Sequence, residues 1–336
     1  MANQSGSQLE YDDWKSDQTS DWSDSTIPNR MPYSFGIEIE LVANPKTVYD
    51  SSNRNEFLNN DIRYWRRRLA DRMNKKKGVH AVTSTRPTNY DRWYIMNDNS
   101  LRYKPRNYQV ALEAVSPKMH DTWTLKRQVN RFWEATNEIF DIESNTSCGA
   151  HIHVAPFGRA YKLVELVKVA HAVATQENHV LKILPQERIN NDYCRPCSFR
   201  SEELKLGLEY SMEYDVEYPS AHVAISLLKM KDATELIHYM QSNSRYVLWN
   251  FQNTTSRSGT VEFRGGRHLT GPVRTKRWTA FTVSFISKAI EDDYIFDMSI
   301  QSDINEWWQS IRHHAMELDM DEFLPASWTS MRDIVR

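Results

Sequence analysis

The alternation of apolar and polar positions predicts a mixed α+β fold. In residues 33–42, apolar side chains alternate with Gly36, Glu38 and Glu40, which is typical of a strand with one buried face. Shorter patterns of this kind predict strands at 79–84, 93–96, 111–115, 150–154, 246–251 and 259–264. Apolar residues at helical spacing predict helices at 62–78, 121–140, 161–184, 227–240, 278–290 and 304–316, and Asp61 is the proposed N-terminal cap of the first.

The order of these elements favours a curved, largely antiparallel sheet flanked by helices, because strands and helices do not alternate strictly. The turn-forming run NTTSRSG separates the last two predicted strands, so we expect them to pair as a hairpin. Residues 190–220 lack a clean period and predict an ordered loop or lid. Residues 1–30 are acidic and polar, and predict a disordered tail. We place one catalytic domain at 31–292 and a helical extension packed on it at 293–336.

Composition narrows the class of protein. The chain has 336 residues, of which 40% are hydrophobic and 12% aromatic, and its net charge is -2. It shows no apolar run long enough to cross a bilayer and no hydrophobic signal core, so we expect a cytoplasmic protein without a membrane partner. Three cysteines do not form a disulfide framework, and the single CxxC of Cys194 and Cys197 is weak support for zinc.

A basic helix face is the one feature that suggests nucleic acid. It combines Arg63, Arg66, Arg67, Arg68, Arg72, Lys75, Lys76 and Lys77. We favour a solvated face, because no aromatic stacking platform is visible nearby and the global charge is slightly negative.

Two strands carry paired functional groups on one face. Glu38 and Glu40 are two positions apart, so their carboxylates point to the same side, either as exposed edge charges or as oxygen ligands for Mg²⁺. In CGAHIHV, His151 and His153 share a face in the same way. Taken alone, these histidines could form a zinc site, but a structural role is the favoured interpretation, by roughly two to one.

A third strand adds an acid beside an arginine. In TVEFR, Glu262 and Arg264 lie on one face while Val261 and Phe263 point toward the core. The carboxylate suits a metal ion, and a guanidinium suits phosphate oxygens, although a cross-strand ion pair is the plainer interpretation. Because charge is costly on a sheet surface that could be apolar, three such strands together favour an oxygen-rich site for Mg²⁺ or Mn²⁺.

The motifs together resemble those of the amidoligase family. In chain order they are FGIEIEL, DNSL, EAVSP, CGAHIHV, RINNDYCRP, RYVLWNFQN and TVEFR, from about residue 33 to 270. That family resembles glutamine synthetase and glutamate-cysteine ligase, in which a sheet holds two or three divalent cations around ATP. The resemblance implies a glutamine synthetase-like fold and an ATP- and Mg²⁺-dependent ligase that joins a carboxylate to an amine through an acyl phosphate.

The resemblance also implies a role for each matched residue. The implied metal ligands are Glu38, Glu40, Glu113, His151 and Glu262. His151 and His153 also meet the nucleotide, and His153 fits a supporting or packing role equally. Arg264 contacts the transferred γ-phosphate, Arg245 contacts phosphate or acyl phosphate, and Asp98 orients the amine. The Gly265-Gly266-Arg267-His268 run after TVEFR departs from a plain pattern beside the phosphates.

Other functions remain open at this point. A metal-dependent hydrolase would use the same histidines and carboxylates to activate water. A phosphagen-kinase-like enzyme would transfer the phosphoryl group to a guanidine on a related fold. Substrates of the ligase would be small-molecule or peptide carboxylates and amines, and the sequence leaves their identity and the oligomeric state open.

Overall fold

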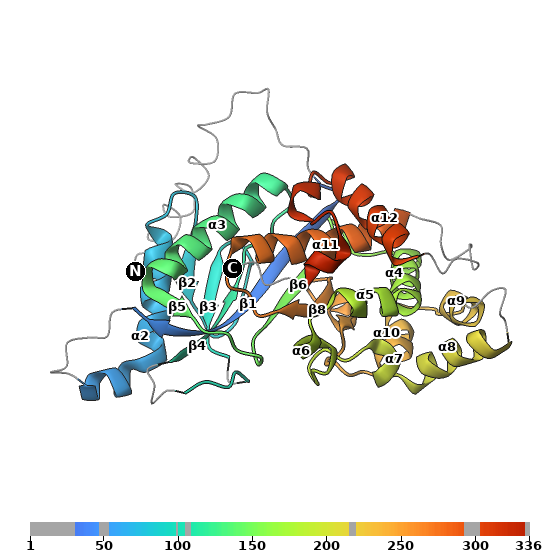
Figure 1. Cartoon of the computed structure of the whole chain (residues 1–336), viewed down its shortest axis with the longest axis horizontal. Coiled ribbons are helices and arrows are strands. Elements are labelled where there is room, and N and C mark those ends of the chain that lie inside the picture. Colours follow the sequence, from blue (N-terminus) through green and yellow to red (C-terminus); the bar gives the residue numbers. More distant parts are fainter. Residues whose placement is uncertain are drawn as a thin grey trace, which may run out of the picture.

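The computed structural model describes residues 31–46, 54–98, 100–104, 109–214, 220–291 and 303–332. The predicted tail at 1–30 lies outside the described residues. The described chain forms a mixed α+β structure in which helices flank one sheet (Figure 1).

The sheet is mostly antiparallel, as predicted. Its strands are β1 (Tyr33–Pro45), β2 (Ala81–Thr83), β3 (Trp93–Met96), β4 (Val110–Val115), β5 (Phe140–Ile142), β6 (Gly149–Pro156), β7 (Trp249–Asn250) and β8 (Val261–Arg267). Their order is β2-β3-β4-β1-β6-β8-β7, with β5 also paired to β1, and only β2 and β3 are parallel. Strands β4, β1, β6 and β8, which carry most predicted site residues, are therefore neighbours.

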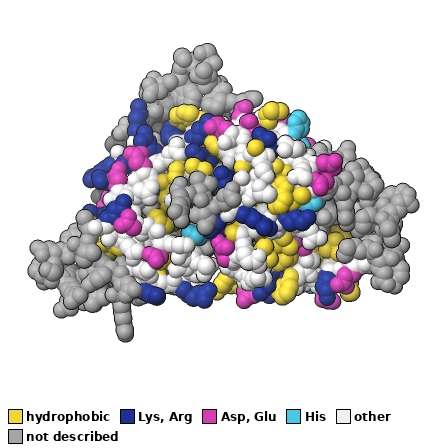
Figure 2. Space-filling model, viewed as in Figure 1, with side chains coloured by type: hydrophobic (Ala, Val, Ile, Leu, Met, Phe, Trp, Pro, Cys, Tyr) yellow, Lys and Arg dark blue, Asp and Glu magenta, His cyan; other side chains and the backbone are white. Residues whose placement is uncertain are grey.

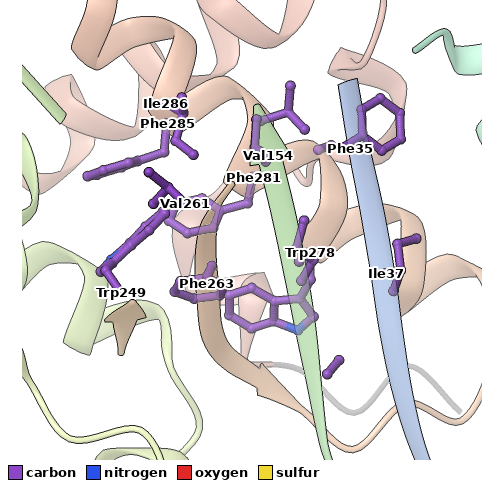
Figure 3. Close-up of a cluster of buried hydrophobic side chains, with 14 of the residues drawn as sticks. Phe35, Ile37, Val154, Trp249, Val261, Phe263, Trp278, Phe281, Phe285 and Ile286 are labelled. Atoms are coloured by element: carbon purple, nitrogen blue, oxygen red, sulfur yellow. The ribbon is translucent and has the colours of Figure 1, made fainter. Parts of the chain in front are cut away.

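Helices α2 (Arg54–Asn74), α3 (Thr122–Ile139) and α11 (Pro272–Glu291) pack against this sheet. The other longer helices, α4 (Leu163–Thr175), α8 (Glu202–Tyr214) and α12 (Ile304–Glu317), pack mainly on other helices. In Figure 3, Phe263 of β8 lies between Trp249 and Trp278, with ring centroids 4.7 and 5.7 Å away. Because this face of β1, β6 and β8 is buried under α11, their opposite residues are left to form a polar site.

The starts of two predicted helices illustrate a success and an error. Helix α3 begins after Asp121, whose carboxylate accepts from the Thr124 backbone N–H at 2.6 Å, as a capping residue should. The predicted start of a helix at Asp61 is wrong, because α2 already includes Arg54. Leu58 precedes Ile62 by one helical turn in the sequence, so the apolar spacing continues through the proposed cap.

Two predicted helices are each divided in the structure. The pattern at 161–184 becomes α4 and α5 (Glu177–Ile183), and Thr175 donates its hydroxyl to the His171 carbonyl oxygen just before the break. The pattern at 227–240 is shifted and divided into α9 (Ala221–Leu228) and α10 (Ala233–Gln241). Asp232 starts α10 by accepting from the backbone N–H groups of the helix.

The prediction of an irregular loop at 190–220 is wrong for most of that segment. It contains α7 (Cys197–Arg200) and α8, which follow α6 (Gln186–Ile189). Gly207 weakens the helical pattern of α8, because glycine is a poor helix former. An added Cβ at this position would lie 3.0 Å from the Tyr239 hydroxyl. Residues 215–219 lie outside the described chain.

The remaining segments complete the chain. Strands β7 and β8 pair antiparallel as predicted, although β7 is shorter than 246–251 and leads into η3 (Gln252–Thr255). After α12 come η4 (Asp321–Phe323) and η5 (Trp328–Met331). Among the described helices, none combines the length and apolar character needed to cross a membrane.

Part of the basic face of α2 is paired with protein groups. Lys76 contacts Glu134 and Glu138 of α3 at 2.7 and 2.6 Å, and Arg66 donates to the Ile95 carbonyl oxygen at 3.1 Å. Figure 2 shows Lys and Arg interspersed with Asp and Glu on the α2–α3 side of the molecule. The α2–α3 side therefore carries charges of both signs, several of them in ion pairs.

Candidate active site

Strands β1 and β6 place Glu38 and Glu40 against the first histidine of CGAHIHV. In the antiparallel register, Glu38 lies opposite His151, and on the other side of β1 Glu40 lies opposite Glu113 of β4. The His151 Nδ1 donates to Glu38 Oε2 at 3.0 Å, and its Nε2 lies 3.7 Å from Glu40 Oε1. Two of the predicted acidic ligands thus meet around the His151 imidazole, which is itself a predicted ligand.

Strand β8 brings the remaining acid and the arginine to the same place. Glu262 pairs with His153, and its Oε1 lies 3.5 Å from His151 Nδ1 and 2.5 Å from Arg264 Nη1. Glu262 and Arg264 are 3% and 6% exposed at their side chains, so this ion pair is buried. The Arg264 Nε also donates to the carbonyl oxygen of Tyr193 at 3.2 Å, which fixes the plane of the guanidinium.

Glu38, His151 and Glu262 form the best-defined group for a cation. One potential ligand atom from each residue lies within 4.8 Å of the others. Two carboxylates and one imidazole are ligands that Mg²⁺ and Mn²⁺ accept.

The charges in this cluster depend strongly on one another. Burial opposes ionisation of Glu38, but the charge of His153 and hydrogen bonds from both histidines hold the pKa of Glu38 well below its usual range. Burial likewise opposes the charge on His153, and attraction to Glu38 and Glu262 outweighs it and raises the pKa of His153. His153 thus acts as a local counter-charge for Glu38 and Glu262.

Glu113 behaves differently from the other acids. Burial, together with repulsion from Glu38, Glu40 and Asp98, raises the pKa of Glu113 to about 9. A carboxyl group held among like charges keeps its proton unless a cation arrives to compensate it. Glu113 is therefore the acid of this group whose ionisation depends most on an added positive charge.

The structure places the other predicted residues around this cluster. His153 Nδ1 lies 3.1 Å from Thr260 Oγ1, and its Nε2 lies 3.2 Å from Glu38 Oε1. Asp98 is half-buried near Glu113 and accepts from the Ser100 backbone N–H at 2.7 Å. Arg245 is exposed on the surface, with its guanidinium 5.9 Å from the Tyr246 ring centroid. The roles assigned to all these residues stay predictions.

The glycine run after TVEFR forms a β-bulge beside Arg264. Register shifts between Ala150 and Ile152, so that two residues of β8 lie opposite His151. An added Cβ at Gly266 would lie 2.6 Å from the Ala150 carbonyl oxygen, and one at Gly265 would lie 2.5 Å from the Phe263 ring. Close approach of β6 to β8 therefore requires glycine at position 266, whereas the side chains of Phe263 and Leu248 leave no room for a Cβ at position 265.

Sequence reasoning missed two residues that support the cluster. Asn250 donates to Glu262 Oε2 at 2.8 Å and accepts from Gln241, while Arg188 donates to the Arg264 carbonyl oxygen at 2.6 Å. Both lie within the motifs RYVLWNFQN and RINNDYCRP, to which no role was assigned for them. Their polar character at buried positions is the signal that was available, because buried polar groups are retained for specific partners.

Comparison with known proteins agrees with the motif pattern. The model of a family described as "putative amidoligase enzyme" matches residues 31–286. This span includes every strand of the sheet and every residue of the cluster. A search among curated proteins found no match to the chain.

Proposed function

The chain belongs to the amidoligase family, whose members are described as amide-forming ligases, and from this premise we propose an ATP- and Mg²⁺-dependent carboxylate-amine ligase. The observation that carries the proposal is the convergence of Glu38, His151 and Glu262 from three neighbouring strands beside Arg264. Metal ligands and a buried guanidinium in contact are what phosphoryl transfer requires.

The donor set fits a divalent cation. Glu38, His151 and Glu262 would hold one ion, and Glu40 and Glu113 would contribute to a second or third. Mg²⁺ or Mn²⁺ bound here would neutralise the phosphate oxygens of ATP during transfer. The buried carboxyl of Glu113, with its pKa raised to about 9, supports this fit because it needs added positive charge to ionise.

Arg264 is suited to the transferred phosphoryl group. Its guanidinium is held on two sides, by Glu262 Oε1 and by the Tyr193 carbonyl oxygen, so its orientation is set before substrate binds. In the proposed reaction, a substrate carboxylate oxygen attacks the γ-phosphorus, the bond to the β-phosphate oxygen breaks, and ADP leaves. Arg264 stabilises the phosphoryl oxygens through this step.

The second step forms the amide. The amine nitrogen attacks the acyl carbon, the bond from that carbon to the phosphate oxygen breaks, and inorganic phosphate leaves while the nitrogen loses a proton. Asp98, at the edge of the cluster, would orient the amine and accept that proton, while His153 and Arg245 would contact the phosphates. A carboxylate close to the attacking nitrogen can do this without a cofactor.

Nucleotide binding tests the proposal before any substrate is known. We would titrate a non-hydrolysable ATP analogue by calorimetry into the parent and Glu262→Gln, with and without Mg²⁺. Binding should require Mg²⁺ and should weaken at least about tenfold in Glu262→Gln, because the variant removes a charged ligand. Glu143→Gln is the matched control, since Glu143 is half-buried and contacts Asn44 outside the cluster.

The other outcomes separate the rival functions. Failure of the parent to bind the analogue, together with tightly bound zinc, iron or manganese, would replace the ligase with a hydrolase. If the nucleotide binds, candidate substrates can be screened by ADP release. An amide product supports the ligase, whereas a phosphorylated guanidine product would make the enzyme a kinase.

A further inference from the structure

An aromatic and basic surface adjoins the candidate active site. We define it as Tyr193, Arg195, Phe199, Arg200, Arg245 and Tyr246 and call it the aromatic–arginine surface. Two chain segments form it side by side, because Arg195 pairs with Val247 in a parallel bridge and its carbonyl oxygen accepts from the Leu248 backbone N–H at 2.7 Å. It is therefore a folded surface, set by backbone hydrogen bonds.

Its rings are exposed in an unusual arrangement. Tyr193, Phe199 and Tyr246 are 48%, 62% and 43% exposed. The rings of Tyr193 and Tyr246 meet edge to face with centroids 5.4 Å apart, and the Arg195 guanidinium lies 4.9 Å from the centre of Phe199. Exposed aromatic rings held by one another and by arginine offer large contact area at low entropic cost, which is characteristic of binding hot spots.

The charge of this surface differs from that of the whole chain. Arg195, Arg200 and Arg245 supply three positive charges, and the neighbouring Asp192, which contacts Arg195 at 2.8 Å, supplies one negative charge. The net charge of the chain, in contrast, is -2. An anionic partner is therefore favoured at this place.

The surface leads directly to Arg264. The backbone carbonyl of Tyr193 accepts from Arg264 Nε at 3.2 Å, so the ring of Tyr193 and the proposed phosphate-binding group belong to adjoining residues. A molecule that rests on Tyr193 therefore contacts the residue whose backbone holds Arg264. This continuity links the surface to the reaction.

The high exposed fraction of these rings indicates what size of ligand the surface can bind. Small-molecule sites enclose most of their ligand, whereas these rings stand 43–62% exposed on the outside of the protein. An extended chain with several contact points can use such a surface. A single-stranded nucleic acid would present no carboxylate for ligation at the neighbouring site.

We propose that the aromatic–arginine surface docks an acidic polypeptide whose carboxylate is the group ligated at the neighbouring site. This inference rests on the proposed function and adds its substrate class. Aromatic side chains supply the contact area, and the arginines select acidic residues flanking the reactive carboxylate.

Binding of a defined acidic peptide tests the inference. A fluorescein-labelled oligoglutamate of about ten residues, long enough to cover several contact points, would be titrated with parent, Phe199→Ala, Tyr246→Ala and the double variant, following anisotropy. We expect binding by the parent and a loss of at least about tenfold in the double variant, although its charge is unchanged. Trp123→Ala is the matched control, because Trp123 is 46% exposed and lies 4.0 Å from Arg127 on α3, outside this surface.

Three results would overturn the inference. One is equal peptide binding by the parent and the double variant, or none by the parent. Another is loss of binding of the ATP analogue in the double variant, which would assign the surface to the nucleotide. The third is tighter binding of an oligouridylate than of the peptide. Failure of the parent to bind the ATP analogue would instead reject the proposed ATP-dependent reaction. The peptide titration would still show whether the aromatic–arginine surface binds an acidic peptide.

Discussion

At the scale of single residues, Arg188 bonds the backbone of β8 and lies close to the start of β6. It is 3% exposed, donates to the Arg264 carbonyl oxygen, and its Nη2 would lie 3.0 Å from a Cβ at Gly149. The backbone N–H of Gly149 in turn donates to Glu40 Oε2 at 2.5 Å. Arg188 thus supports the backbone of Arg264 directly and lies beside the glycine whose N–H holds Glu40.

Arg188→Lys should therefore impair the site through these contacts. A lysine keeps the charge but cannot match the planar guanidinium, so we expect affinity for the magnesium-bound ATP analogue to fall about tenfold and the free energy of unfolding by about 1–3 kcal/mol. Arg66→Lys is the control, because Arg66 also donates to a backbone carbonyl oxygen, that of Ile95, but away from the site. If a folded Arg188→Lys variant bound the magnesium-bound ATP analogue as tightly as the parent, Arg188 would have no role in positioning the site.

A buried histidine outside the site gives the protein a pH-dependent stability. Burial lowers the pKa of His171 in α4 from 6.5 to about 4. Between pH 6.5 and pH 4 the unfolded chain binds a proton that the folded chain does not. The free energy of unfolding is therefore not reduced by His171 above pH 6.5, and it decreases as the pH falls toward 4.

Denaturant titrations from pH 7 to pH 5 should show this effect. The free energy of unfolding should decrease with acidification, with a contribution from His171 of up to about 1.4 kcal/mol per pH unit. His171→Leu should reduce the slope, whereas substitution of the exposed His80 serves as the control. A slope identical in parent and His171→Leu would show that this ring does not titrate with unfolding.

At the scale of elements, the sequence predicts best where one local rule is sufficient. Alternation located β1 and the two-residue period correctly placed Glu38 and Glu40 on one face, and the helical spacing at 121–140 located α3. Prediction failed at α8, where Gly207 weakens the helical pattern and an added Cβ would lie 3.0 Å from the hydroxyl of Tyr239, a residue remote in the sequence. The meeting of Glu38 with Glu262 also depends on sheet order, which no local pattern specifies.

The β-bulge between β6 and β8 is the element most sensitive to substitution. Gly266→Ala would force a Cβ to within 2.6 Å of the Ala150 carbonyl oxygen, and backbone cannot move aside as a flexible side chain can. We expect a loss of about 1–3 kcal/mol in unfolding free energy and weaker binding of the ATP analogue. Gly271→Ala should have little effect, because an added Cβ there meets nothing within 4 Å. Equal stability of the two variants would contradict a tightly closed bulge.

At the scale of the whole molecule, the C-terminal segment packs on the helix that covers the sheet. Trp307 and Trp308 of α12 are each 1% exposed, and their rings lie 6.2 and 6.4 Å from Phe281 of α11. Phe281 in turn contacts Phe263 of β8, at 5.6 Å between centroids. A continuous apolar path therefore joins α12 to the strand that carries Glu262 and Arg264, although the family match ends at residue 286.

This path predicts that α12 stabilises the site from a distance. Trp308→Ala should cost about 3–5 kcal/mol of unfolding free energy, because it leaves a large cavity against Phe281. Met316→Ala on the same helix is the control, since Met316 is 57% exposed. A chain shortened to residues 31–291 should lose still more, because it uncovers the whole α12 side of α11. If that shorter chain melted at the parent's temperature, α12 would be an independent appendage and the division at residue 292 would be a boundary between separately stable parts.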